Sequence, residues 1–254
     1  MTMEHLVTEA WRIYQHAKAT SNGILVRPSI PILFFGDSQR YFHSPRKIIT
    51  VGLNPSRQEF PTNSPFSRFT LAKDVYPEIL HGDRKAEYLS ALNVYFRTAP
   101  YTPWFASYEP LLNGMRASFY DGAESTALHT DLCSPLATDP TWSRLTYRSR
   151  SDLIPAGGAL WHELVRLLAP DVIIASVARA HLANVNFRKL RGWRLIHTVQ
   201  RANPFTVEAI NLEIATGKAS TLVFGQAAQL PFGTVSSSDR HRIGATIGRL
   251  LDGR

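Results

Sequence analysis

The sequence contains a single cysteine, Cys133, among its 254 residues. One thiol cannot form an internal disulfide, and it cannot supply the several thiolates that hold an iron–sulfur cluster or most structural zinc ions. The nine histidines are scattered along the chain, and none belongs to an H-E-x-x-H pair of the kind that binds catalytic zinc. We therefore expect no metal and no other cofactor.

Long apolar runs are absent as well, because no stretch approaches the roughly 18 apolar residues that a membrane-spanning helix needs. Residues 1–20 mix charges into a helical period, which is not the pattern of a signal peptide. These absences favour a cytoplasmic protein without a membrane partner. No linker rich in Gly, Ser or Pro divides the chain. We expect a monomer with one domain over residues 1–254, in which residues 1–45 form an N-terminal helix and hairpin extension and residues 46–254 an α/β core.

Basic residues exceed acidic ones, 28 Lys and Arg against 20 Asp and Glu, which gives a formal net charge of +8. Such an excess favours a polyanionic partner, because Lys and Arg contacts to phosphates release counterions. Much of the excess lies late, in residues 179–201 and 236–249. The charge indicates DNA as the partner, while a basic protein with no nucleic-acid role remains the alternative.

Apolar segments that predict strands alternate with amphipathic segments that predict helices. Residues 47–53 are apolar almost without interruption, which is typical of a strand covered on both faces. Residues 3–18 have an amphipathic helical period, and residues 30–44 predict a hairpin around residues 37–39. The alternation predicts an α/β protein, a three-layer α/β/α fold with a central, mostly parallel sheet. Further strands are expected at 125–134, 171–177, 192–200 and 220–228, further helices at 83–96, 105–118, 157–170, 178–185 and 239–251, and a long loop at 58–82, while 201–218 is left without assignment.

Two polar residues lie near the ends of predicted strands. Asn54 follows the first strand in the turn "GLNP", and Asp131 lies near the end of the second. Ligands of open α/β sheets bind beyond the carboxyl ends of the strands, so the two side chains would converge on one crevice if these strands are neighbours. The alternative is that Asn54 only caps a turn and Asp131 only satisfies a loop.

The segment "VGLNPS", residues 51–56, resembles the first motif of the uracil-DNA glycosylase superfamily. In the single-strand-selective and mismatch-specific branches this motif is a strand followed by Gly-x-Asn-Pro-Gly. Pro65 and Phe66, about a dozen positions after the Asn, resemble the Pro-Phe of the single-strand-selective branch. "HTDLCSP", residues 129–135, is similar to the His-Asn-Leu-Cys-Pro pattern at the end of the second strand of that branch. The resemblance implies a DNA glycosylase that flips out and hydrolyses off a deaminated base, uracil first of all, and leaves an abasic site.

The resemblance also implies roles for individual residues. Asn54 would orient the attacking water, Phe66 would stack on the flipped base, and Asp131, assisted by His129, would read it. Alternatively, Phe66 only packs its loop and His129 is a hydrogen-bonded core histidine. The catalytic residues are then Asn54 and Gln229, and the substrate-binding residues are Gly52, Leu53, Pro55, Ser56, Phe66, His129 and Asp131.

Two positions depart from the family pattern. The family reads uracil with an Asn where this chain has Asp131, and an ionised Asp can accept hydrogen bonds but cannot donate to uracil O4. Either burial keeps Asp131 protonated, or the alignment is one residue off, or the base is not uracil. The late motif of the family opens with a histidine that is missing after residues 220–228, where Gln229 is the nearest polar residue. The other possible placement of this motif offers His197, Arg201 and Asn203.

The segment that opens the last predicted helix suggests contacts with DNA. Ser236, Ser237 and Ser238, with Ser238 as the N-cap and with Arg240 nearby, would bind a phosphate at the helix N-terminus. Leu230 or Phe232 would wedge into the DNA where the base leaves. The alternatives are a well-capped surface helix and two core residues. Three functions remain open besides uracil excision: a glycosylase for another base, a non-catalytic nucleic-acid-binding member of the fold, and an enzyme for a free nucleotide.

Overall fold

The computed structural model describes residues 1–20, 23–74, 76 and 83–253. Contacts divide the chain into two compact units, each built from three segments. The first unit comprises Met1–Asp37, Gly52–Tyr101 and Thr130–Leu167, and the second comprises Ser38–Val51, Thr102–His129 and Leu168–Arg254. The expectation of one domain concerns independent folding and stays a prediction.

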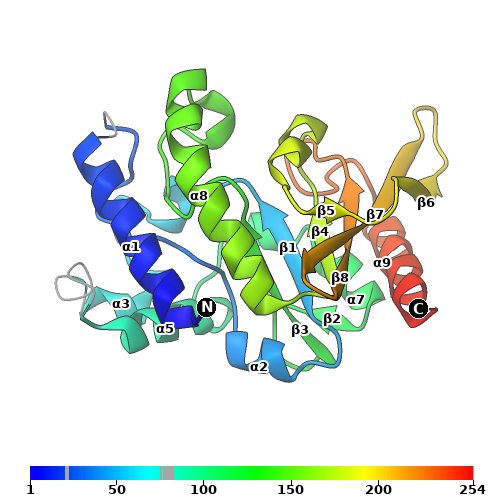
Figure 1. The fold of residues 1–254 in the computed structure, drawn as a ribbon, viewed down its shortest axis with the longest axis horizontal. Coiled ribbons are helices and arrows are strands. Elements are labelled where there is room, and N and C mark those ends of the chain that lie inside the picture. The colour runs from blue at the N-terminus through cyan, green and yellow to red at the C-terminus, as the bar shows by residue number, and fades with distance from the viewer. Residues whose placement is uncertain (21–22, 75, 77–82, 254) are drawn as a thin grey trace. The chain divides into compact units, whose positions relative to one another are not determined.

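Eight strands in the described part of the chain form one sheet in the order β2-β3-β1-β4-β8-β7-β5, with β6 paired to β7 (Figure 1). β1 and β8 run parallel to β4, and β2 runs parallel to β3, whereas β5, β6 and β8 are antiparallel to β7. Helices flank this sheet, so the predicted α/β fold with a central, mostly parallel sheet is confirmed. The strands are β1 Ile48–Gly52, β2 Ala117–Ser118, β3 Ser125–Asp131, β4 Val172–Ala175, β5 Arg188–Lys189, β6 Arg194–Val199, β7 Phe205–Ala215 and β8 Lys218–Gly225.

Three neighbouring strands, β1, β3 and β4, are buried throughout, as the apolar sequence predicts for β1. Every residue of β1, β3 and β4 is buried, and in β1 the side chains of Ile48, Ile49 and Val51 are at most 1% exposed. β7 differs because buried and more exposed residues alternate along much of it, which is typical of a strand with one solvated face. β7 and β8 form a hairpin whose turn contains Gly217 at a φ of +73°, a conformation that glycine adopts without strain.

In the second unit, helices α7 and α9 approach closely because each contributes a glycine at the contact. A Cβ atom on Gly114 would lie 2.1 Å from the carbonyl oxygen of His241, and one on Gly244 would lie 1.9 Å from that of Leu111. A side chain at either glycine would therefore push the helices apart. The helices of this unit are α2 Ser38–His43, α6 Thr102–Phe105, α7 Glu109–Gly114, α9 Ser237–Asp252 and the 3₁₀ helix η4 Arg179–Asn184.

The first unit holds the longest helices. α1 buries the stripe predicted from its sequence, including Leu6, Ala10 and Ile13. α8 starts ten residues before the predicted residue 157, at Tyr147, and contains Pro155. Within the described residues no helix is both long enough and apolar enough to cross a membrane. The described helices of this unit are α1 Met3–Thr20, α3 Thr70–Lys73, α5 Lys85–Asn93, α8 Tyr147–Leu168 (its last residue counted in the second unit) and the 3₁₀ helices η1 Arg57–Glu59, η2 Tyr95–Arg97 and η3 Trp142–Arg144.

Three local predictions are wrong. Residues 30–44 do not form a hairpin: residues 38–43 are α2, and the main chain of Ile32 donates to Pro135 O at 2.7 Å instead of to a hairpin partner. The N-cap of α9 is Ser236, not Ser238, so this helix starts earlier than predicted. The predicted loop 58–82 contains the end of η1 and all of α3, while residues 75 and 77–82 lie outside the described residues.

Candidate functional site

The carboxyl ends of β1 and β3 lie side by side, which was the condition for Asn54 and Asp131 to lie near each other. The two strands are neighbours in the sheet. Beyond them the pairing continues, because Leu132 N donates to Gly52 O at 3.0 Å and Cys133 N to Leu53 O at 2.9 Å. The turn that carries Asn54 and the segment that follows Asp131 are thereby held together in the first unit.

The side chain of Asn54 is fixed in one orientation by two acceptors. Its Nδ2 donates to Leu136 O at 3.1 Å and to Thr138 Oγ1 at 2.9 Å. Leu136 O can only accept, and the Thr138 hydroxyl donates its single proton to Pro140 O at 3.0 Å. The amide nitrogen must therefore occupy this position, and Oδ1 is directed elsewhere. The half-buried Asn54 thus presents an acceptor oxygen that has no hydrogen-bond partner among the described residues.

Glu59 is a buried acid that the sequence analysis did not identify. Its side chain is 5% exposed, and Tyr95 Oη donates to its Oε2 at 2.6 Å. Burial, opposed in part by the Tyr95 hydrogen bond and the Arg68 charge, raises the pKa of Glu59 to about 7. The spacing Ser-x-x-Glu from Ser56 is that of a helix capping box, which favours an exposed glutamate, so the pattern gave no signal of burial. Ser56 does cap η1, accepting from Gln58 N at 3.2 Å.

Asp131 is buried in the first unit as well, with 7% of its surface exposed. Burial raises the pKa of its carboxyl group well above the usual value, and the negative charge of Glu59 raises this pKa further. A raised pKa favours the neutral acid, which offers one O–H donor and one carbonyl acceptor. A neutral Asp131 therefore presents the same pair of groups as the side-chain amide of an asparagine.

Phe66 lies in an aromatic cluster and is only 9% exposed. Its ring meets Phe60 edge-on at a centroid distance of 6.3 Å and Tyr76 at 4.7 Å. These contacts agree with the packing alternative, and a stacking role for Phe66 stays a prediction. Of the other residues assigned around Asn54, Gly52 and Pro55 are buried, and Leu53 and Ser56 are half-buried.

His129 is a core histidine of the second unit. It is 2% exposed, Thr50 Oγ1 lies 2.7 Å from its Nδ1, and the edge of the Phe105 ring packs on it. Burial lowers its pKa to about 3, so the ring is neutral at physiological pH. This is the alternative given in the sequence analysis, and we no longer assign His129 to base reading.

Phe232, in the segment after β8, does not have the position expected of a DNA wedge. The ring of Phe232 is fully buried between Tyr108 and Phe205, and its main-chain N–H donates to Ser176 Oγ at 2.9 Å. Phe232 is therefore a core residue and not a DNA wedge. Leu230 is 37% exposed and keeps the wedge role as a prediction, and Gln229 is exposed just before it.

The predicted phosphate site at the start of α9 is largely occupied by the protein itself. Ser236 Oγ accepts from Asp239 N at 3.1 Å and donates to the Asp239 carboxylate at 2.6 Å, which brings a negative charge to the helix N-terminus. Arg240 donates to Val235 O at 2.8 Å and to Ser107 O at 3.0 Å. Ser237 and Ser238 are exposed. This arrangement is that of a well-capped helix, and phosphate binding here stays a prediction.

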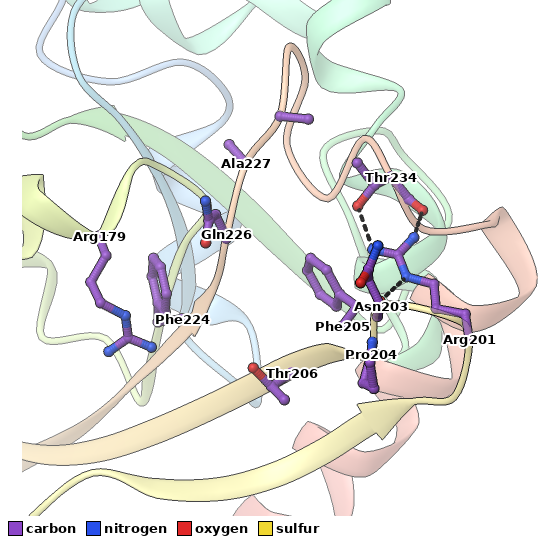
Figure 2. Close-up of a pocket in the computed structure, with 11 residues that line it drawn as sticks. Arg179, Arg201, Asn203, Pro204, Phe205, Thr206, Phe224, Gln226, Ala227 and Thr234 are labelled. Carbon is purple, nitrogen blue, oxygen red and sulfur yellow. Dashed lines mark hydrogen bonds between the residues drawn. The ribbon is translucent and has the colours of Figure 1, made fainter.

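A pocket of about 400 Å³ opens in the second unit, and both sequence segments considered for the late motif line it (Figure 2). Arg201 and Asn203 come from the segment before β7, and Gln226 and Thr234 come from the segment after β8. His197 is not part of this pocket, since its Nδ1 lies 3.2 Å from Thr246 Oγ1 of α9. From the sequence the two segments are alternatives, whereas in the structure both line the same pocket.

Among the described residues, no group of three or more His, Cys, Asp or Glu side chains is arranged to hold a metal ion. A comparison with models of known protein families found no match, and a comparison with curated protein sequences found none. The function must therefore be argued from the chemistry of the residues.

Proposed function

We propose that this chain is a monofunctional DNA glycosylase of the cytoplasm that hydrolyses a deaminated base, uracil first of all, from DNA. The observation that carries the proposal is the fixed orientation of Asn54. Two acceptors, Leu136 O and Thr138 Oγ1, hold its nitrogen, so its oxygen is available at the carboxyl end of β1. The likeness of "VGLNPS" to the glycosylase motif supports the same role.

In the proposed reaction, Asn54 Oδ1 accepts a hydrogen bond from a water molecule and orients it toward the anomeric carbon of the sugar. Asn54 is neutral and cannot remove a proton, so it acts by positioning. The C–N bond breaks through a sugar with cationic character, water adds to the anomeric carbon, and the departing base leaves as an anion. The products are the free base and an abasic site.

Asp131 would read the base in its protonated form. Uracil presents the O4 acceptor and the N3–H donor, and a neutral carboxylic acid can donate to the first and accept from the second. The buried environment of Asp131 and the nearby charge of Glu59 both favour this neutral form. Of the three explanations for an aspartate at this position, protonation by burial is the one that these surroundings support.

The proposal is tested by incubating undamaged control oligonucleotides and oligonucleotides that contain uracil, hypoxanthine or xanthine with excess protein, in single- and double-stranded form. Alkaline treatment then cleaves any abasic strand. We expect cleavage of the uracil-containing strand and none of the undamaged control. If no modified base is released under these conditions, the proposal is wrong.

A second candidate function is nucleic-acid binding without catalysis. The observation in its favour is that residues 229–238 contain no histidine, and the nearest polar residue after the strand, the exposed Gln229, is a weaker neutral donor. This candidate predicts salt-dependent DNA binding that survives Asn54→Ala, together with no base release from any substrate.

A further inference from the structure

None of the described residues that line the pocket of the second unit is acidic (Figure 2). Two arginines, Arg179 and Arg201, contribute to opposite sides of it, and the rings of Phe224 and Phe205 form part of its wall. Its volume of about 400 Å³ lies in the ordinary range of ligand pockets. A basic pocket with aromatic walls suits an anionic ligand that also has a planar group.

The guanidinium group of Arg201 is held in place by hydrogen bonds to neutral groups. Its Nε donates to Asn203 O at 2.8 Å, and its two terminal nitrogens donate to Thr234 O and Thr234 Oγ1. All three acceptors are neutral, and no described carboxylate forms an ion pair with it. The guanidinium therefore has a fixed position and an uncompensated positive charge, which are the properties of a phosphate-binding group.

Arg179 differs because it is already paired. It forms an ion pair with Glu208, and its guanidinium lies 4.7 Å from the centroid of the Phe224 ring. This charge is largely neutralised, and the planar group stacked on Phe224 is suited to contact a base rather than a phosphate.

Polar groups that can read a base edge come from both sides of the pocket. The exposed side chain of Gln226 makes no hydrogen bond within the described residues and offers both a donor and an acceptor. Asn203 and Thr206 are exposed as well and add further polar groups. Because so many lining residues are exposed, the pocket is open to solvent, and a longer chain can enter and leave it.

We propose that this pocket binds one nucleotide of an unpaired DNA strand, with its phosphodiester on Arg201 and its base against Arg179, within reach of Gln226. An unpaired strand is required, because in a duplex the base edges are paired and the faces are stacked. This inference rests on the proposed function for the identity of the polymer, DNA. It does not require that the protein release a base.

The experiment measures binding of an undamaged, fluorescently labelled thymidine tetranucleotide by anisotropy at several salt concentrations. The variants are Arg201→Gln and Gln226→Ala, and the matched control is Arg191→Gln, an exposed arginine of the same unit outside the pocket. Gln226→Ala separates loss of binding from loss of structure. The Gln226 side chain contacts no described residue by a hydrogen bond, so its removal should leave the fold intact, whereas Arg201 also anchors a loop.

We expect Arg201→Gln to weaken binding roughly tenfold, as for the loss of a charge-assisted hydrogen bond. It should also reduce the slope of log K against log salt by about 0.7, the value for one phosphate of a single strand. Gln226→Ala should weaken binding roughly threefold without a change of slope, and Arg191→Gln should alter binding less than twofold. Equal binding by all three variants, or displacement of the tetranucleotide by thymidine monophosphate at equal concentration, would overturn the inference.

Base release by the same proteins separates this inference from the proposed function. If the wild type releases no base but the pocket variants lose binding, the glycosylase proposal fails and the pocket assignment stands. If base is released and the pocket variants bind the undamaged strand as the wild type does, the pocket assignment fails alone.

Discussion

Each unit holds a group of ionisable residues, but the group of the first unit is buried and the group of the second unit is exposed. In the first unit, Glu59 and Asp131 are buried, and burial raises both pKa values, which favours the neutral acids. In the second unit, Arg179 and Arg201 are exposed at a pocket, where Arg179 pairs with Glu208 and Arg201 donates to neutral acceptors. An acidic residue in the sequence therefore need not carry a negative charge in the folded protein, because burial favours its neutral form.

We expect the strongest loss of base release from a substitution of Asn54. Asn54→Ala removes the oriented oxygen, and we expect base release to fall by roughly 100-fold or more, as when a positioned polar group of an active site is lost. Single-turnover rates with a uracil-containing strand measure this. Asn113→Ala, which removes an exposed asparagine of α7, is the matched control. Unchanged rates in Asn54→Ala, with the thermal unfolding temperature preserved, would contradict the role of Asn54.

The burial of Glu59 can be tested through the pH dependence of the thermal unfolding temperature. The pKa of Glu59 in the folded protein, about 7, lies above its ordinary value of 4.5, so its contribution to stability is complete below pH 4.5 and is lost as the pH rises through 7. The loss amounts to roughly 3 kcal/mol, as an order of magnitude. Glu59→Gln cannot ionise, so between pH 5 and 8 its unfolding temperature should fall less than that of the wild type.

The matched control for this prediction is Glu124→Gln, since Glu124 is an exposed acid whose side chain has 55% of its surface accessible. It should keep the pH dependence of the wild type. If Glu59→Gln keeps it as well, Glu59 is not the group that titrates, and the account of the buried acids is incorrect.

A smaller effect is expected at Asp131. Wild-type uracil release should decline as the pH rises through the raised pKa of Asp131, because the ionised carboxylate can no longer donate to O4. Asp131→Asn keeps both hydrogen-bonding groups and cannot ionise, so it should lose this decline and release uracil faster, by roughly tenfold on the alkaline side. Rates followed from pH 5 to 9 with both proteins measure the difference. Equal profiles would remove Asp131 from base recognition.

No change is expected in the salt dependence of DNA binding when Asp131 is replaced. Binding of undamaged single-stranded DNA should weaken with salt, because exposed arginines bind phosphates. Asp131→Asn should leave the slope of log K against log salt unchanged, since a neutral buried acid contributes no counterion effect. Anisotropy titrations of both proteins at four salt concentrations test this. A changed slope would mean that Asp131 is ionised in the free protein.

The sequence predicted the parts of the fold that follow from regular patterns. The predictions of a strand around β1 and of a buried stripe with Leu6 and Ala10 on α1 are confirmed. The sequence places Asn54 and Asp131 near strand ends, and the structure shows that these strands are neighbours. The sequence does not predict β7, because the polar residues on its solvated face interrupt the apolar pattern. The hairpin at 30–44 was predicted wrongly, because a cluster of apolar residues buried on all sides resembles a strand.

The candidate sites were less accessible from the sequence, because burial and convergence depend on the tertiary structure. Glu59 has the spacing of a surface capping residue, and only its hydrogen bond to Tyr95 and its 5% exposure identify it as a core acid. Phe232 stands in a loop beside exposed residues, yet its ring is fully buried. The pocket combines Arg201 with Gln226, which the antiparallel pairing of β7 and β8 brings together from separate segments.

The turn that carries Asn54 also has a consequence for the chemical ageing of the protein. Asparagine side chains lose their amide nitrogen over time when the backbone nitrogen of the next residue gives up its proton and attacks the side-chain carbonyl. The next residue here is Pro55, whose nitrogen has no proton to give. An aspartate formed at position 54 could not donate to Leu136 O, so this damage would break the hold on the side chain. Pro55 thus blocks this route of deamidation and preserves the amide whose nitrogen donates to Leu136 O and Thr138 Oγ1.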